Sequence, residues 1–207
     1  MATKAEKTRE RILAVTQALV LEKGFSGTSL DDVLRETELT KGAFFHHFKS
    51  KAELAREMVE RYWENDCQLF LGFAKRAEEL ADDPLQETLI FLKLFEEFVR
   101  CVTHPMPGCV FASYTYESQQ FDPSIHEFIQ EGFDKRGAMY AEKFEAVLNR
   151  YKPAIDVTAH ELAEMIMSVI EGGFILARSY RDPEFIARQS KQFRQYLQLL
   201  FSAGAQN

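Results

Sequence analysis

Apolar residues recur three and four positions apart along nearly the whole chain, whereas alternation of apolar and polar residues is almost absent. This periodicity predicts helices and no sheet. The first helix is expected over residues 4–23, with Ile12, Val15 and Leu19 on one face. It should end at Gly24, because glycine takes the left-handed conformation of a C-terminal cap without a Cβ penalty. The whole pattern predicts an all-α protein of about nine helices.

Capping residues indicate where the next helices begin. Two short helices are expected over residues 30–37 and 41–47, each preceded by a serine or threonine suited to an N-terminal cap. Ser50 and Glu53 have the spacing of a capping box and predict a longer helix from residue 51 to about residue 73.

Three Asp-Pro dipeptides mark further helix starts, because each places a capping carboxylate before a proline suited to the first helical turn. They predict starts near residues 84, 123 and 183. Thr158 with Glu161 marks another start. The segment HPMPG, residues 104–108, should break the chain between one helix ending near Thr103 and another beginning near Cys109.

The composition is that of a folded protein without a leader or a membrane span. With 207 residues, of which 46% are hydrophobic, the chain can bury a real core. It has no signal-peptide pattern and no apolar run long enough to cross a bilayer, so we expect a cytoplasmic protein with no membrane partner. Three cysteines indicate free thiols rather than a disulfide framework.

The net charge of −7 is unevenly spread. Residues 1–56 hold ten Lys/Arg and eight Asp/Glu, a net charge of +2, while residues 57–207 hold fifteen and twenty-four, a net charge of −9. A basic N-terminal region beside an acidic remainder favours one orientation of approach to a polyanion, since the acidic part is repelled. We therefore predict an N-terminal three-helix domain over residues 1–50 and a larger helical domain over residues 51–207.

The two short helices fit a helix-turn-helix, in which the first helix braces the second in the major groove of DNA. Their connection is only a few residues long. A small shared core would be formed by Val33, Leu34, Leu39, Phe44 and Phe48.

If Phe44 and Phe48 point inward, the other faces of the second helix are free to meet DNA. Those faces and the helix start carry Thr40, Lys41, Gly42, Ala43, His46 and His47. A metal site at the two histidines is the competing interpretation. Adjacent helical positions point about 100° apart and do not chelate as residues four apart do, so we expect no bound metal.

Several motifs in fixed order resemble the tetracycline-repressor (TetR) family of bacterial regulators. They are TRERIL, EKGFSGTSLDDVL and LTKGAFFHHFKSKAEL, and the resemblance extends from residue 8 to about residue 62. It implies that Thr28 and Ser29 hold a phosphate at a helix N-terminus, where N–H groups and the helix dipole favour an anion. It also implies that Lys41, Gly42 and Ala43 face base edges, with Lys41 able to donate to guanine.

The same resemblance implies contacts along the DNA backbone, which hold register without reading sequence. These would come from Phe45, His46, His47 and Lys51. Three positions depart from the family pattern. Glu38 stands where a glycine usually makes the turn, so either the turn differs or Glu38 is left-handed at a cost of about 1 kcal/mol. Ala43 lacks a hydroxyl and Phe45 replaces a tyrosine, so readout should depend more on Lys41 and on DNA shape.

Beyond residue 60 only the overall architecture resembles the family, which has there a helical domain that binds an effector and forms a homodimer. Small residues allow close helix approach, and two amphipathic stripes predict a four-helix dimer interface. The predicted interface residues are Ser168, Gly172, Gly173, Ala177, Phe193, Tyr196, Leu197 and Leu200. The competing interpretation is that both helices only complete the core of one chain.

An unknown small-molecule effector would bind among aromatic residues of the larger domain, although aromatics in a helical bundle also serve as plain core. The candidate lining residues are Trp63, Phe70, Phe95, Phe98, Cys109, Tyr114 and Phe174. Cys109 follows Gly108 at the expected start of a helix, where the dipole would favour a reactive thiolate. Burial as an inert thiol is the alternative for Cys109.

The sequence thus predicts a ligand-responsive transcriptional regulator, expected to be a repressor, that binds a pseudo-palindromic double-stranded DNA operator as a dimer. An all-helical enzyme or small-molecule carrier is the main alternative. The sequence has no nucleophile elbow, His-Glu-x-x-His motif, phosphate loop or cysteine pair at metal spacing. We therefore expect no enzymatic activity and no cofactor. A regulator-like interaction module that has lost DNA binding is a third alternative.

Overall fold

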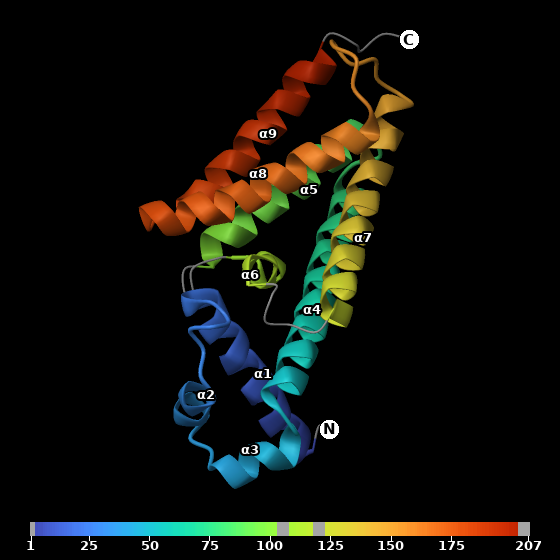
Figure 1. The fold of residues 1–207 in the computed structure, drawn as a ribbon. Coiled ribbons are helices and arrows are strands. Elements are labelled where there is room, and N and C mark those ends of the chain that lie inside the picture. The colour runs from blue at the N-terminus through green and yellow to red at the C-terminus, as the bar shows by residue number, and fades with distance from the viewer. Residues whose placement is uncertain (1–2, 103–107, 118–122, 203–207) are drawn as a thin grey trace. The chain divides into compact units, whose positions relative to one another are not determined.

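The computed structural model describes residues 3–102, 108–117 and 123–202, and over these residues the chain is helical without strands (Figure 1). The predicted all-α class is therefore confirmed. The helices are α1 (Lys4–Lys23), α2 (Leu30–Thr37), α3 (Lys41–His47), α4 (Lys51–Leu80), α5 (Pro84–Cys101), α6 (Val110–Tyr116), α7 (Pro123–Leu148), α8 (Ala159–Tyr180) and α9 (Glu184–Ser202).

Side-chain caps explain why helices begin at the positions predicted from local sequence. The Asp83 carboxylate accepts hydrogen bonds from the N–H groups of Leu85 and Gln86, at 3.1 and 3.0 Å. Thr158 and Glu161 form the expected capping box. α4 continues to Leu80 rather than ending near residue 73. The break at residues 104–107 and the cap expected from residue 122 lie outside the described part of the chain.

The helices form two compact units. The first contains residues 1–67 and 109–129, and the second contains residues 68–108 and 130–207. The boundary predicted between residues 50 and 51 falls at the start of α4, which begins in the first unit and continues into the second. Packing thus groups the first half of α4 and all of α6 with the N-terminal helices.

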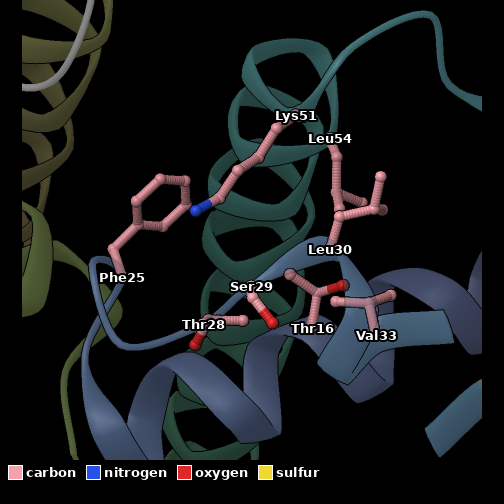
Figure 2. Close-up of a pocket in the computed structure, with 8 residues that line it drawn as sticks. All are labelled: Thr16, Phe25, Thr28, Ser29, Leu30, Val33, Lys51 and Leu54. Atoms are coloured by element: carbon pink, nitrogen blue, oxygen red, sulfur yellow. The ribbon is translucent and has the colours of Figure 1, made fainter. Parts of the chain in front are cut away.

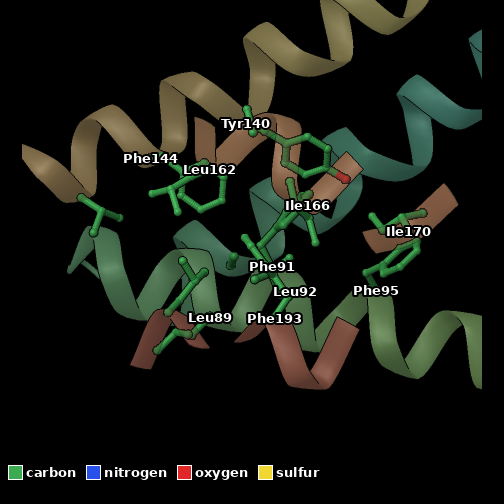
Figure 3. Packing of buried hydrophobic residues seen from close by; sticks show 14 of the residues in the cluster. Leu89, Phe91, Leu92, Phe95, Tyr140, Phe144, Leu162, Ile166, Ile170 and Phe193 are labelled. Carbon is green, nitrogen blue, oxygen red and sulfur yellow. The ribbon is translucent and has the colours of Figure 1, made fainter. Parts of the chain in front are cut away.

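The second unit is built on one hydrophobic core that joins α5, α8 and α9 with parts of α4 and α7 (Figure 3). Phe91, Leu162 and Ile166 are at most 1% exposed. A partly buried ion pair joins α5 to α9, since Arg194 donates to the Glu96 carboxylate at 2.7 Å. Glu96 is fully buried, so this hydrogen-bonded partner offsets a large desolvation cost.

The backbone conformation at the C-terminus of α1 requires a glycine. Gly24 has φ 77° and ψ 171°, a backbone region open to glycine but outside the left-handed helical region that we expected. A Cβ on Gly24 would also lie 2.7 Å from a carboxylate oxygen of Glu117. The helix therefore ends at the predicted residue, with a different conformation and with a contact that is remote in sequence.

Across the described residues, the helices lack the combination of length and apolar character needed to span a bilayer.

Candidate nucleic-acid interface

α2 and α3 are held as a helix-turn-helix by a small buried core in the first unit. Val33 is 2% exposed, and Phe44 and Phe48 are fully buried, with ring centroids 5.7 Å apart. Leu34 and Leu39, which we also predicted for this core, are half-buried. The inward faces of α2 and α3 are thus largely those the sequence predicted.

The start of α3 is fixed by its cap and is open on its outer side. The Thr40 hydroxyl accepts a hydrogen bond from the Ala43 N–H at 3.3 Å. Thr40, Lys41 and Gly42 are exposed, and a Cβ on Gly42 would meet nothing within 4 Å. No contact among the described residues therefore requires glycine at position 42, although glycine in a helix costs about 0.5–1 kcal/mol relative to alanine.

The remaining predicted residues of α3 follow the same surface. Phe45 is 44% exposed and meets the buried Phe44 edge to face at 5.4 Å. His46 is exposed and His47 half-buried, with their rings 5.4 Å apart. Burial lowers the pKa of His47, and His46 and Arg9 act in the same direction, so neutral imidazole is favoured there. Within the described ranges, the structure has no cluster of three or more His, Cys, Asp or Glu placed to hold a metal.

Burial of Thr28 argues against the phosphate contact that the resemblance implies. Its side chain is 2% exposed, and its hydroxyl donates to the carbonyl of Gly24 at 2.8 Å. Ser29 caps α2, with its hydroxyl accepting from the Asp32 N–H at 3.1 Å and donating to the Asp32 carboxylate at 2.7 Å. Of the two predicted residues, only Ser29 lies on the surface.

Lys51 projects from the first turn of α4 toward Phe25 (Figure 2), and its amino nitrogen lies 4.8 Å from the ring centroid. These two residues lie over a cavity of about 10 Å³ between α1, α2 and α4. That volume holds at most one water molecule, so the cavity is a packing gap rather than a ligand site. The exposed Lys51 remains available to a phosphate.

The turn between α2 and α3 shows how Glu38 is accommodated where a glycine usually lies. Glu38 is left-handed, with φ 54° and ψ 33°, so the second of the two predicted alternatives is confirmed. The Leu39 N–H donates to the Leu34 carbonyl at 3.1 Å, and the Glu38 N–H to that of Arg35 at 3.2 Å. This is the Schellman pattern, with glutamate at the position that glycine usually occupies.

Replacing Glu38 by glycine or by alanine removes the same carboxylate, but only glycine also removes the steric cost of the left-handed backbone. We expect Glu38→Gly to be more stable than Glu38→Ala by about 1 kcal/mol. Urea unfolding followed by circular dichroism measures this difference. Equal unfolding midpoints would show that the left-handed conformation carries no cost here.

Glu117 makes a contact that the sequence did not predict. It follows α6, and its carboxylate accepts hydrogen bonds from the N–H groups of Phe25 and Ser26 at 2.9 and 2.6 Å, and from the Ser26 hydroxyl. One turn earlier, the Tyr114 ring lies 5.1 Å from the Phe25 ring. The end of α6 therefore holds the loop between α1 and α2. No local sequence signal points to a pair 91 residues apart.

The predicted effector residues are divided between the two units. Trp63 stacks on Phe111 in the first unit, with ring centroids 5.8 Å apart and an interplanar angle of 19°. Tyr114 and Cys109 are buried in the same unit, at 0% and 4% exposure. Burial raises the pKa of the Tyr114 hydroxyl far above its usual range. These residues fill packing space around α6.

The other four predicted residues belong to the second unit. Phe70 and Phe95 pack on each other in its core, with ring centroids 5.9 Å apart. Phe98 is 37% exposed and Phe174 is half-buried against this core. None of the seven lines the open cleft of about 290 Å³ that lies between α4, α5 and α7. In that cleft Lys143 donates to Glu87 at 2.8 Å.

The predicted dimer residues divide by exposure. Five of the eight are buried in the core of the second unit and have almost no surface left for a partner: Gly173, Ala177, Phe193, Leu197 and Leu200. For these five residues the structure supports the core alternative. A Cβ on Gly173 would lie 3.5 Å from the Ile186 Cα, an ordinary van der Waals contact, so Gly173 packs on α9 at a place where an alanine would also fit. Ser168 is exposed, and Gly172 and Tyr196 are half-buried.

A different set of apolar side chains is exposed on α8, namely Met165 at 41%, Ile175 at 44% and Leu176 at 39%. Their helical spacing places them on the same face as Ser168 and Gly172. On α9, Leu199 is 72% exposed. Sequence spacing did not distinguish the exposed faces of α8 and α9 from the buried ones.

Two family descriptions match the chain. The one for bacterial regulatory proteins of the tetR family matches residues 12–58, which contain α2 and α3. The one for the C-terminal domain of LmrA/YxaF-like transcriptional regulators matches residues 90–192.

Individual relatives agree with these matches. The transcriptional regulator LmrA of Bacillus subtilis is 26% identical over 82% of this chain and 86% of its own. An HTH-type regulator encoded in the lacX 3' region of Lactococcus lactis is 26% identical over 84% of this chain and 85% of its own. The Escherichia coli repressor NemR is 41% identical over 56 residues, which cover 27% of this chain and 28% of its own.

Solved structures show the same fold. A TetR-family regulator from Agrobacterium tumefaciens superposes with a TM-score of 0.79 at 20% identity, covering 93% of this chain and 98% of that one. The reduced form of Escherichia coli NemR superposes with a TM-score of 0.72 at 19% identity, covering 91% and 96%. With a helix-turn-helix whose outer face is open, two matching family descriptions and relatives that are transcriptional regulators, the chain belongs to the TetR family of DNA-binding transcriptional regulators.

Proposed function

We propose that this regulator is a homodimeric repressor that places α3 of each chain in the major groove of a pseudo-palindromic operator. Its action would be binding rather than catalysis. The observation that carries the proposal is the open first turn of α3, where Lys41 and Gly42 are exposed beside a rigid buried core. The empty space at Gly42 would allow a base edge to approach the backbone, and Lys41 could donate to guanine.

Contacts to the DNA backbone would flank this turn. Ser29 at the start of α2 and Lys51 at the start of α4 are both exposed. Phe45, His46 and His47 follow on α3 and would pack along the sugar-phosphate chain. Since Thr28 is buried, we do not include it among the contacts.

The proposed dimer forms through the exposed apolar face of α8. Gly172 supports this choice, because a Cβ there would meet no atom of the described part of its own chain within 4 Å. Glycine within a helix costs about 1 kcal/mol, and close approach of a partner helix supplies a reason for it. The proposed interface therefore keeps Ser168, Gly172 and Tyr196 and adds the exposed apolar residues of α8 and α9: Met165, Ile175, Leu176 and Leu199.

We also propose that a small effector binds in the second unit and weakens DNA binding by favouring another conformation. The cleft of about 290 Å³ lined by Met139, Glu87 and Lys143 offers space for one. We favour a non-covalent effector, because Cys109 is only 4% exposed and a buried thiol is shielded from electrophiles in solution.

A selection from random duplexes tests the DNA-binding proposal and identifies the operator in the same experiment. The full-length protein should enrich a pseudo-palindrome whose half-sites are spaced by about 34–36 Å or a multiple, that is, by whole helical turns. Two chains should bind each duplex, and affinity should fall steeply as salt rises, because phosphate contacts release counterions. Enrichment of no sequence, or affinity that does not depend on salt, would contradict the proposal.

A further inference from the structure

Arg9, on α1, connects three parts of the first unit at the C-terminal end of α3. Its Nη1 group donates to the carbonyl of His47, the last residue of α3. Its Nη2 group donates to both carboxylate oxygens of Glu57 on α4. Its guanidinium carbon lies 4.3 Å from the centroid of the Phe48 ring. The Arg9 side chain thus contacts the last residue of α3, the Phe48 ring that follows it, and Glu57 on α4.

This arrangement matters because α3 has only seven residues. A helix of that length is not stable alone, so its direction depends on the contacts at its two ends. The carbonyl groups of its last turn lack helical partners and carry partial negative charge, which a guanidinium satisfies. The planar fork of arginine can hold the His47 carbonyl and the Glu57 carboxylate together, whereas a lysine ammonium lacks this geometry.

We infer that Arg9 is a positioning residue for α3, which sets the direction of that helix in the DNA groove without touching DNA itself. The inference rests on the proposed role of α3 as the helix that reads DNA. Phe44 holds the inward side of α3 and Arg9 holds its C-terminal end, so together they fix where Lys41 and Gly42 point.

Arg61 provides a matched control, because it also ties α4 to α1 but directs its hydrogen bonds to α1 rather than to α3. It donates to Glu10 at 2.6 Å and to Gln17 at 2.8 Å. Loss of Arg61 should therefore reduce the stability of the same unit without turning α3. Methionine suits both positions, since it keeps an apolar stem of similar length and removes the charge.

The experiment compares wild type, Arg9→Met and Arg61→Met on a duplex that the wild type enriches and on a scrambled duplex. Binding is measured at several KCl concentrations and at a temperature where circular dichroism shows all three folded. Arg9→Met should weaken binding to the enriched duplex by about tenfold, with a much smaller effect on the scrambled one. The slope of log affinity against log salt should stay as in wild type, and Arg61→Met should keep the wild-type ratio between duplexes.

Two results would overturn the inference. Equal weakening on both duplexes, with a slope reduced by about 0.9, would make Arg9 a direct phosphate contact. An unchanged affinity ratio in Arg9→Met would remove the positioning role. Failure of the proposed function is distinct, because the wild type itself would then discriminate no duplex.

Amide hydrogen exchange provides a second readout that needs no DNA. Exchange at α3 should be faster in Arg9→Met than in wild type, while Arg61→Met should leave α3 protected. Arg9→Lys should recover only part of the protection of α3, since lysine restores the charge without the planar fork of the guanidinium group. Equal α3 exchange in the two methionine variants would also overturn the inference.

Discussion

Replacing Phe44 by alanine is expected to lower the free energy of unfolding by about 4 kcal/mol. Phe44 is fully buried and packs on Phe48, so the substitution leaves a cavity in the core that holds α2 and α3 in the first unit. The loss would approach the lower end of the stability of a typical domain, which is about 5–15 kcal/mol. Urea unfolding followed by circular dichroism measures the loss. Fluorescence of Trp63, the single tryptophan of the chain, reports on the first unit separately.

Phe45→Ala is the matched control, because its ring is adjacent in sequence but 44% exposed. It should cost about 1 kcal/mol or less, while weakening contact with DNA. Similar losses of stability in the two alanine variants would contradict the assignment of one phenylalanine to the core and the other to the surface.

Replacing Ile175 by glutamate is expected to dissociate the proposed dimer, raising its dissociation constant by a hundredfold or more, about 3 kcal/mol. A carboxylate on the exposed apolar face of α8 would be buried without a partner in the proposed interface. Stability of the single chain should change little, because Ile175 is 44% exposed within it. Analytical ultracentrifugation over a concentration series measures the change.

Tyr116→Glu serves as the control, since Tyr116 is an exposed aromatic residue on α6, at 73% exposure. It should leave the dimer intact. Gly172→Ala should weaken the dimer while making α8 more stable, because alanine favours a helix by about 1 kcal/mol. A dimer that tolerates Ile175→Glu as well as it tolerates Tyr116→Glu would place the interface elsewhere.

Local signals made the helix boundaries predictable. α1, α2 and α3 have the predicted bounds, since a cap or a glycine marks their ends within a few residues. Asp83 and Thr158 act in the same way for α5 and α8. The predicted end of α4 near residue 73 was wrong, because residues 74–80 carry no glycine or proline and the helix continues through them.

Which face of α8 is buried and which is exposed was not predictable from one sequence. Both kinds of face repeat apolar and small residues at the same helical spacing, so Gly172 and Gly173 look alike. Only the structure shows that Gly173 faces Ile186 and that Gly172 faces open space. The predicted interface therefore mixed two faces of the same helix.

Contacts between distant residues were also beyond the sequence. Glu117 reaches the loop after α1 from 91 residues away, and Arg9 reaches His47 from 38. Each of these depends on how helices pack, which periodicity and capping do not specify.

The most direct test of the central claim, that the first turn of α3 reads DNA, is the affinity of Lys41→Ala for an enriched duplex and for a scrambled one. Lys41 is exposed, so folding should be unaffected. We expect a loss of about 1–3 kcal/mol on the enriched duplex and only the smaller loss of one charge on the scrambled duplex. An equal loss on both duplexes would show that Lys41 contacts phosphate alone and would contradict the claim.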